Sequence, residues 1–142
     1  MNSKNTKPEL KVQSILKNKK LFFVKHIKAL AGTPDIVIPS HKIIIDIKGC
    51  FWHQHGCNNS KFPKTNQLFW VGKFEKIKIK DTENLKFNKK KGWNTFDIWE
   101  CIIDDHHRLN DEINRILEIG KLINQSSSLN RYNSKQFKIK TF

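Results

Sequence analysis

The sequence lacks several features that would place it in common classes of protein. No run of apolar residues is long enough to cross a membrane, and the N-terminal residues contain no apolar stretch like that of a signal peptide. Cysteine is scarce, and three residues are an odd number that does not suit a framework of disulfides. We therefore expect a cytoplasmic protein with no membrane partner, whose cysteines are candidate metal ligands.

Acidic residues are also in short supply. The 142 residues include 27 Lys and Arg against 13 Asp and Glu, which gives a net charge of +14 and an isoelectric point near 9.8. A charge of this size attracts polyanions, and lysine–phosphate contacts gain affinity by releasing counterions. We interpret the charge as evidence for a nucleic-acid partner. The alternative is an AT-rich genome, which encodes Lys and Asn wherever a surface tolerates them.

Apolar periodicity and turn residues predict interleaved helices and strands. Helices are predicted at residues 8–17, 66–91 (one helix with a break, or two) and 111–123, and strands at 21–28, 35–38, 42–48 and 94–99. Residues 49–65 form an irregular loop between them. This order predicts an α/β fold with a mixed central sheet flanked by helices, in one domain of residues 1–124. Residues 125–142 form a polar tail without a core pattern, which we expect to be flexible.

Two aspartates and a lysine form the first candidate catalytic group. Asp35 begins one predicted strand, and Asp46 and Lys48 lie near the end of the next. If these strands pair as a hairpin, both carboxylates meet at one edge of the sheet, where they supply oxygen ligands for Mg²⁺. Such an ion activates water and offsets charge on a phosphodiester, and Lys48 projects from the same face as Asp46. The pattern predicts a nuclease site of the PD-(D/E)xK type.

The spacing of Asp35, Asp46 and Lys48 is loose enough to occur by chance. In the alternative interpretation, Asp35 lies in a turn, and Asp46 and Lys48 form an ordinary cross-strand ion pair. However, the latter two residues interrupt a strand that is otherwise almost entirely apolar. Charges in such a position are costly unless they are used, which favours the catalytic interpretation.

Cysteine and histidine gather in the loop that follows. Cys50, His53, His55 and Cys57 fall close together, and Cys101 follows the last predicted strand. Structural zinc takes four nitrogen or sulfur ligands in a tetrahedron, and the three cysteines with His55 supply such a set. A closed set of four leaves no position for substrate, so this Zn²⁺ is predicted to be structural and His53 stays free for chemistry. Buried thiols beside incidental histidines are the alternative.

Aromatic residues surround the same loop. Phe51 and Trp52 lie within it, and Trp70 lies near the start of the next helix. Flat side chains near a catalytic edge can wedge between base pairs and unstack them, although the core is the default location for Trp in a small domain. We expect Trp93 and Trp99 in the core. Phe51, Trp52 and Trp70 are candidate DNA-wedge residues.

Several segments resemble the Vsr family of very short patch repair endonucleases, a branch of the PD-(D/E)xK nucleases. The most specific is the run G-C-F-W-H-Q-H-G-C at residues 49–57, followed by W-E-C at 99–101. Residues 3–9, 32–35, 69–70 and 92–93 continue the resemblance, which covers about residues 3–103. It implies a restriction-endonuclease-like core that carries a structural zinc site.

The resemblance also implies a nuclease that nicks double-stranded DNA beside a thymine mispaired with guanine. On this basis Asp35 bridges Mg²⁺ ions, His53 is the general base for the attacking water, and Glu9 supports the site from the first helix. The implied zinc ligands are the four that the spacing suggests, and the implied intercalating residues are the three wedge candidates. The zinc set is Cys50, His55, Cys57 and Cys101, and the wedge is Phe51, Trp52 and Trp70.

Three departures from the family pattern stand out. The family usually has an apolar residue, Thr or a similar residue, and His before Gly-Cys, whereas this chain has Asp46-Ile47-Lys48. That triplet is general to PD-(D/E)xK enzymes, with the Ile47 backbone carbonyl as a further Mg²⁺ ligand, and the mechanism then depends less on His53. The segment before Glu9 is short, which weakens the case for mismatch specificity. Ile77 and Lys80 stand where the family often has Asn and Arg.

Three functions follow from these features. The favoured one is a mismatch-specific endonuclease that nicks one strand beside a T·G mispair. A restriction-type nuclease that cuts paired duplex is supported by Asp46 and Lys48. A zinc-stabilised DNA-binding module without cleavage is disfavoured, because every predicted catalytic residue is present. Nicking requires a single active site, so we expect a monomer.

Overall fold

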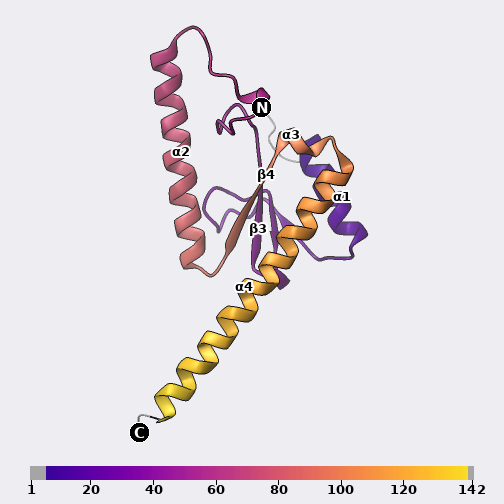
Figure 1. Ribbon diagram of the computed structural model, residues 1–142, viewed down its shortest axis with the longest axis vertical. Helices are drawn as coiled ribbons and strands as arrows, with labels where there is room; N and C mark the ends of the chain where they lie inside the picture. Colours follow the sequence, from indigo (N-terminus) through magenta and orange to yellow (C-terminus); the bar gives the residue numbers. More distant parts are fainter. Residues whose placement is uncertain (1–5, 141–142) are drawn as a thin grey trace.

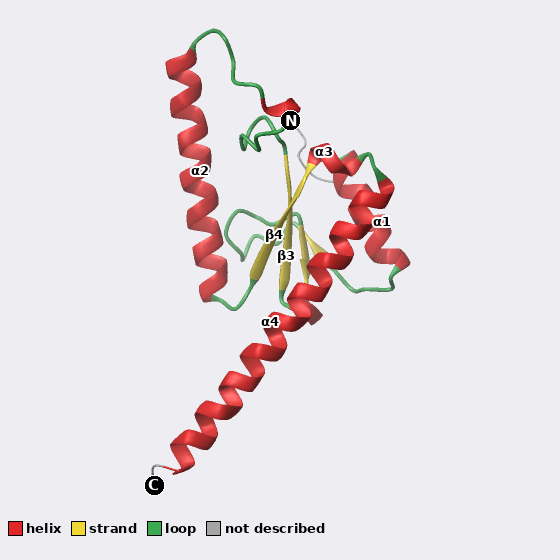
Figure 2. Ribbon diagram, viewed as in Figure 1, coloured by secondary structure: helices red, strands yellow, loops and turns green. Residues whose placement is uncertain are grey.

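A four-stranded mixed sheet with helices on both faces organises the computed structural model, which describes residues 6–140, with side chains described to residue 126 (Figures 1 and 2). The elements in chain order are α1 (Lys7–Asn18), β1 (Val24–Lys25), β2 (Ile36–Ile38), the 3₁₀ turn η1 (Pro39–His41), β3 (Ile43–Lys48), the 3₁₀ turn η2 (Asn58–Ser60), α2 (Gln67–Lys90), β4 (Asn94–Trp99), α3 (Glu100–Ile103) and α4 (His106–Lys140). The α/β class and the mixed sheet predicted from the sequence are confirmed.

The strands lie in the order β1-β2-β3-β4. β2 runs antiparallel to both β1 and β3, and β4 runs parallel to β3. A parallel neighbour requires a crossover connection, and here α2 and its flanking loops provide it. The register pairs Asp46 directly with Asp97, and Lys48 with Trp99. The side chains of Asp46, Lys48 and Asp97 therefore share one face of the sheet near the carboxyl ends of β3 and β4.

The opposite face of the sheet carries the main hydrophobic core. Alternate isoleucines of β2, β3 and β4 pack there against the apolar stripes of α1 and α4, and this cluster is almost completely buried. Thr6 precedes helix α1 as its N-cap, where its hydroxyl oxygen accepts a hydrogen bond from the Glu9 amide, and Pro8 lies in the first turn. Its buried face includes two polar residues, Glu9 and Gln13, alongside the apolar ones. Glu9 is thereby buried, with 3% of the residue exposed.

Helix α2 contacts the sheet much less closely. Asn88 is the only buried residue of this helix, and its side-chain amide exchanges two hydrogen bonds with the backbone of Ala31, at 2.8 and 3.0 Å. Ala31 belongs to the loop that leads into Asp35, so Asn88 fixes that loop against α2. A small cluster of Leu30, Val37 and Ile44, with Trp93 against it, fills the space beneath this contact.

Several predicted element boundaries are wrong. The strand expected at residues 21–28 is reduced to Val24–Lys25, because His26 adopts a left-handed conformation with φ 51° that ends it. Helix α2 is continuous where a break was allowed for. The helix expected at residues 111–123 begins at His106 and continues to Lys140, so residues 125–140 extend α4 away from the sheet (Figure 1). The domain boundary at residue 124 stays a prediction. Among the described residues, no helix is both long and apolar enough to cross a membrane.

Candidate functional site

The loop after β3 brings four sulfur and nitrogen donors together. Cys50, His55, Cys57 and Cys101 each offer one donor atom, and all four atoms lie within 4.8 Å of one another. Cys101 comes from α3, which follows β4, so the cluster joins the loop to the far end of β4. The His55 ring stacks on Trp99 with centroids 4.1 Å apart, which fixes the orientation of the imidazole. The four residues that the sequence predicts as zinc ligands are therefore neighbours.

The separations within this cluster suit a tetrahedral metal. His55 Nδ1 lies 3.8 Å from Cys50 Sγ and 3.6 Å from Cys101 Sγ. Sulfur and nitrogen ligands at ordinary zinc distances in a tetrahedron stand about 3.6 Å apart. Burial raises the pKa of the Cys50 thiol to about 12, whereas the contact with His55 lowers the pKa of Cys57 to about 7. The donor set and its dimensions fit Zn²⁺.

Asp35 lies directly before β2, between two other chain segments. Its Oδ2 accepts a hydrogen bond of 2.8 Å from the backbone amide of Ile47 in β3. On the α1 side it adjoins Glu9, whose carboxylate also lies 3.0 Å from His26 Nε2. Burial and the nearby Glu9 charge raise the pKa of Asp35, although the Ile47 hydrogen bond opposes that shift.

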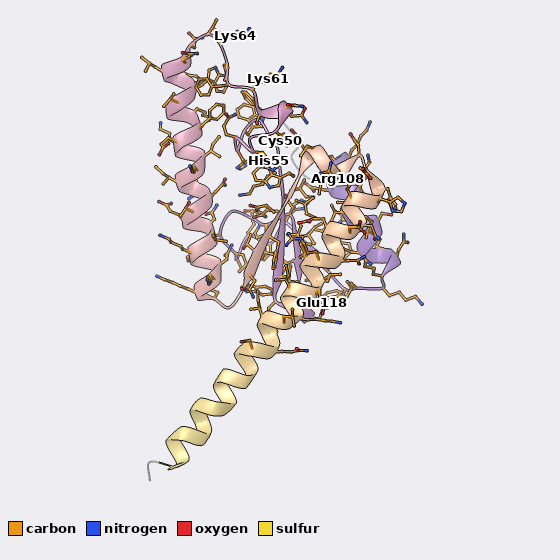
Figure 3. All side chains as sticks on the ribbon, viewed as in Figure 1. Cys50, His55, Lys61, Lys64, Arg108 and Glu118 are labelled. Carbon is orange, nitrogen blue, oxygen red and sulfur yellow. The ribbon has the colours of Figure 1, made fainter. Side chains whose placement is uncertain are left out.

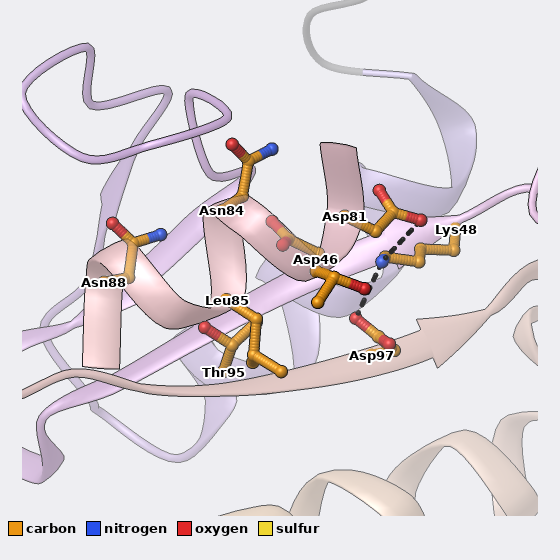
Figure 4. Close-up of a pocket in the computed structure, with 9 residues that line it drawn as sticks. Asp46, Lys48, Asp81, Asn84, Leu85, Asn88, Thr95 and Asp97 are labelled. Carbon is orange, nitrogen blue, oxygen red and sulfur yellow. Dashed lines mark ion pairs between the residues drawn. The ribbon is translucent and has the colours of Figure 1, made fainter. Parts of the chain in front are cut away.

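Asp46 and Lys48 line a polar pocket between the sheet and α2. The lining includes Asp81, Thr82, Asn84 and Asn88 of α2, and Thr95 and Asp97 of β4 (Figure 4). Lys48 Nζ lies 3.3 Å from Asp81 and 3.5 Å from Asp97, so two carboxylates hold this largely buried ammonium group. Burial, followed by the nearby charge of Asp35, raises the pKa of Asp46 to about 7. Asp46 therefore lies close enough to Asp35 for the two carboxylates to repel each other.

His53 is held by an acidic residue that sequence reasoning missed. Its Nδ1 lies 2.6 Å from Oδ2 of Asp81, the same oxygen that faces Lys48. The network therefore runs from Asp97 through Lys48 and Asp81 to His53, and connects β4, β3, α2 and the loop. One ring nitrogen of His53 is engaged by a carboxylate, and the arrangement can orient the other toward a substrate.

The three candidate wedge residues lie together at the start of α2. The ring centroid of Phe51 is 5.3 Å from that of Trp52 and 5.4 Å from that of Trp70. Phe74 packs behind Phe51 at 5.3 Å. Trp52 is 49% exposed, and nearby Phe69 is 63% exposed. This aromatic cluster is therefore accessible at its outer edge. The exposed Lys61 and Lys64 lie in the segment between η2 and α2 (Figure 3).

Two further acidic residues and one histidine join the predicted set. Asp97 lies between the apolar residues Phe96 and Ile98, so a weaker form of the argument that singled out Asp46 applies to it. Asp81 is one of few acidic residues in a lysine-rich helix, but its partners depend on how α2 packs. His26 has no sequence signal of its own. Of the aromatic residues expected in the core, Trp93 packs against the small cluster and Trp99 against His55.

The chain has relatives among known nucleases. Residues 1–59 match the family described as DNA mismatch endonuclease Vsr. The chain is 32% identical over 110 residues to DNA mismatch endonuclease Vsr of Escherichia coli (strain K12), an overlap that covers 78% of this chain and 70% of that protein.

Two proteins named as type II nicking enzymes are also similar. V.XorIIP of Xanthomonas oryzae pv. oryzae is 37% identical over 116 residues, which cover 82% of this chain and 85% of the relative. V.NmeAIP of Neisseria meningitidis is 34% identical over 117 residues, which cover 82% of this chain and 84% of the relative. The overlap in each case takes in most of both proteins.

Proposed function

Because the chain belongs to the Vsr family of DNA mismatch endonucleases, we propose that it nicks one strand of double-stranded DNA beside a T·G mispair. The observation that carries the proposal is the linkage of the predicted catalytic side chains: Asp46 adjoins Asp35, and Lys48 shares Asp81 with His53. The names of the relatives support cleavage of DNA at a mismatch and nicking of one strand.

The fold of the proposed nuclease is a restriction-endonuclease-like core. The β2–β3 hairpin followed by the parallel strand β4 supports this assignment, since it carries Asp35 and the Asp46-Ile47-Lys48 triplet on neighbouring strands. In a PD-(D/E)xK site the two acidic residues bind the catalytic metal, and the lysine lies beside it. We assign the core to residues 1–124.

The Asp35 and Asp46 carboxylates and the backbone carbonyl of Ile47 are the proposed Mg²⁺ ligands. A divalent cation would relieve the repulsion between these two buried carboxylates. The raised pKa values of Asp35 and Asp46 support a cation at this position. A metal held by these ligands would supply Lewis-acid stabilisation of the scissile phosphate and would make an attacking water more acidic. Glu9 adjoins Asp35 and limits its movement.

His53 is the proposed general base. Asp81 accepts the Nδ1 proton of the imidazole, which leaves the Nε2 lone pair free to take a proton from the attacking water. Lys48, held by Asp81 and Asp97, presents its positive charge near the same point and stabilises the developing charge on phosphate. Asp81 therefore positions both groups.

The zinc ion is proposed to be structural. Cys50, His55, Cys57 and Cys101 would complete a tetrahedron and leave no open position. Such a site would fix the loop that carries His53, and also Phe51 and Trp52. The aromatic cluster would then enter the base stack beside the mispair, where stacking is weak.

The substrate is proposed to be duplex DNA, bound by a monomer in the cytoplasm. The net charge of +14 supports a polyanionic partner. One active site per chain suits nicking, because cutting both strands at one position usually requires two.

Strand-resolved cleavage of a T·G-mismatched duplex and its fully paired twin, each with Mg²⁺, tests the proposed function. We expect one nick, confined to the mismatched duplex, and none with Asp35→Asn. Cleavage of the paired duplex on both strands would assign the protein to the restriction-type enzymes instead. Binding of both duplexes without cleavage would reject the catalytic roles of Asp35, Asp46 and Lys48. Asp104→Asn, at an exposed surface position, is the matched control.

A further inference from the structure

One face of helix α2 contacts three parts of the proposed site. Residues spaced alternately three and four positions apart lie on the same side of a helix. The residues with this spacing in α2 are Trp70, Phe74, Ile77, Asp81, Asn84 and Asn88. The first two belong to the aromatic cluster, Asp81 contacts His53 and Lys48, and the last two reach the loop that leads into Asp35 (Figure 4).

Asn88 attaches the C-terminal end of this helix to the Asp35 loop. All residues of α2 are described, and Asn88 alone among them is buried, with 3% of the residue exposed. Its side-chain amide accepts a hydrogen bond of 2.8 Å from the Ala31 N–H and donates one of 3.0 Å to the Ala31 carbonyl. One turn earlier, Asn84 lies so close to Gly32 that a Cβ atom added to this glycine would come within 2.7 Å of the Asn84 Nδ2 atom. Two amides of α2 therefore hold two consecutive residues of the loop.

The loop requires such support because its backbone is strained. Gly32 and Thr33 both have positive φ angles, of 78° and 46°. Glycine tolerates this region, whereas a β-branched residue such as Thr33 is an outlier there. Strained backbone persists where the surrounding structure holds it, and the two hydrogen bonds of Asn88 do so here. Asp35 follows Thr33 by two residues, so the position of its carboxylate depends on this loop.

We propose that Asn88 is a positioning residue for the reaction: through Ala31 it sets the position of Asp35, and through α2 it links that position to the aromatic cluster. The inference rests on the proposed function, in which Asp35 binds metal and the cluster enters the base stack. A regular helix can carry a displacement along its length, so insertion of Trp70 beside a mispair would act on the Asn88 end of α2. Recognition of the mispair would thereby favour the loop arrangement that cleaves.

The other role open to Asn88 is to stabilise the fold without any effect on catalysis. The two roles differ in measurable ways. A residue that only stabilises the fold can be replaced without a change in kcat, as long as the protein stays folded. Its replacement also has the same effect whether or not Trp70 is present.

The first experiment is single-turnover cleavage of the T·G-mismatched duplex by the zinc-loaded full chain, below the melting temperature of each variant. Asn88→Asp keeps an acceptor for the Ala31 N–H but loses the donor to its carbonyl. We expect kcat to fall by about tenfold to a hundredfold with Kd nearly unchanged, because small displacements of a catalytic group have effects on this scale. Ile79→Ala, at a position of α2 that is 52% exposed, is the control and should have natural kcat.

Natural kcat in folded Asn88→Asp would overturn the proposal. If the buried charge of this variant prevents folding, Asn88→Ser removes the amide without adding a charge and should show the same loss of kcat. Natural kcat in Asn88→Ser would overturn the proposal equally.

A compensating change in the loop tests whether Asn88 acts through it. Thr33 is exposed, and asparagine adopts positive φ more readily than threonine does. Thr33→Asn should therefore reduce the strain that Asn88 restrains. Added to Asn88→Asp, it should recover part of the lost kcat. A double variant as slow as Asn88→Asp would show that the loss does not arise in the strained loop.

A double-variant cycle with Trp70→Ala tests the link along α2. Trp70 and Asn88 are 18 positions apart, which is about 27 Å along a helix. Independent changes at such a separation have effects on kcat that multiply. We expect the double variant with Asn88→Asp to lose much less kcat than the product of the two single losses. Losses that multiply would overturn the link.

Hydrogen exchange without added Mg²⁺ provides a readout that involves no cleavage. The mismatched duplex should slow exchange of the amides in residues 30–35 more than the paired duplex does. Asn88→Asp should abolish this difference, and Ile79→Ala should retain it. Equal exchange with both duplexes in the natural protein would overturn the link. A protein that shows the difference but cuts neither duplex with Mg²⁺ would contradict the proposed function and not the link along α2.

Discussion

Single side chains in this site serve more than one partner. Oδ2 of Asp81 lies 2.6 Å from His53 and 3.3 Å from Lys48, so one carboxylate orients both the proposed base and the proposed cationic group. Asp97 holds Lys48 from the other side at 3.5 Å. If Asp81 were absent, Lys48 would keep Asp97, whereas His53 would lose the ion-pair partner that it has among the described residues.

Asp81→Asn should therefore impair catalysis while leaving DNA binding intact. An amide at this position can hydrogen-bond the imidazole but cannot stabilise the imidazolium that forms when His53 takes a proton. We expect kcat for nicking to fall by about 10²-fold or more, since general-base catalysis contributes on that scale, with little change in Kd. Single-turnover cleavage and a binding titration measure the two quantities. An Asp81→Asn enzyme of natural activity would remove His53 from the base role.

The sequence indicates only some of these residues, and the difference has a physical reason. Asp46 and Lys48 stand out because a charged residue in an apolar strand is costly, and the same logic reaches Asp97. Asp81 and His26 have no such contrast, since one lies in a lysine-rich helix and the other in a loop. Their importance depends on tertiary contacts, which no local pattern encodes.

At the scale of elements, the loop after β3 depends on side chains more than on regular structure. Between Lys48 and Gln67 the loop contains a single 3₁₀ turn, η2, and the Cys50–His55–Cys57–Cys101 cluster ties it to α3. The Glu100 carboxylate accepts a hydrogen bond of 3.0 Å from the Cys50 amide and adds a second tie. The loop conformation should therefore depend on the metal.

His55→Gln should remove the zinc and loosen the loop. We expect zinc content to fall from about one ion per chain to well below that, because an amide side chain is a poor zinc ligand. Amide hydrogen exchange should accelerate across residues 50–60, and the melting temperature should fall. His107→Gln on the exposed face of α4 should change none of these. Full zinc content in His55→Gln, measured by elemental analysis, would refute the ligand assignment.

Helix α4 approaches β3 closely at Gly120. A Cβ atom added there would overlap the buried Ile43 side chain, and the Asn124 amide donates a hydrogen bond of 2.6 Å to the His41 carbonyl one turn later. Gly120 therefore lets the helix pack directly on the end of the strand.

Gly120→Ala should destabilise the protein although alanine is the better helix former. The overlap should outweigh the propensity gain and lower the free energy of unfolding by about 1–2 kcal/mol. Gly72→Ala, in the open part of α2 with no neighbour within 4 Å, should be neutral or stabilising. Ile43→Val removes the overlapping methyl group and should recover part of the loss in a double variant. Additive losses in denaturant unfolding would contradict the overlap.

Element boundaries were predicted unevenly for a related reason. β3 is an apolar run and β4 contains the large apolar residues Phe96, Ile98 and Trp99, and both strands form close to the expected residues. β1 is short because it can pair only with the three-residue strand β2 and ends at His26. The early start of α4 at His106 and its continuation past residue 123 occur in segments without an apolar stripe, which the periodicity criterion does not detect.

At the scale of the whole molecule, the surface charge governs the encounter with DNA. The net charge is +14, and the exposed Lys61 and Lys64 lie in the segment that leads into α2, the helix that carries Trp70 of the aromatic cluster (Figure 3). Phosphate contacts made by such residues give no sequence selectivity but determine how affinity depends on salt.

Lys64→Ala should reduce the salt dependence of DNA binding. If Lys64 contacts one phosphate, the slope of log K against log salt should decrease in magnitude by about 0.9. Lys17→Ala, on the exposed side of α1, should leave the slope unchanged. Fluorescence anisotropy over a salt series measures both slopes. Equal changes in the two variants would indicate diffuse attraction by net charge instead of a contact at Lys64.

The parallel pairing of β3 with β4 also determines when the nuclease can assemble during synthesis. When synthesis has reached the end of α2, the nascent chain already contains Glu9, Asp35, Asp46, His53 and Asp81. Three parts are added afterwards. They are β4, which pairs with β3, Asp97, which holds Lys48, and Cys101, which completes the cysteine and histidine cluster. The proposed reacting groups are thus translated before β4, which carries Asp97, and before Cys101. An incomplete chain therefore contains the proposed catalytic residues but should be unable to cleave the cell's own DNA, because these residues are not yet held in position.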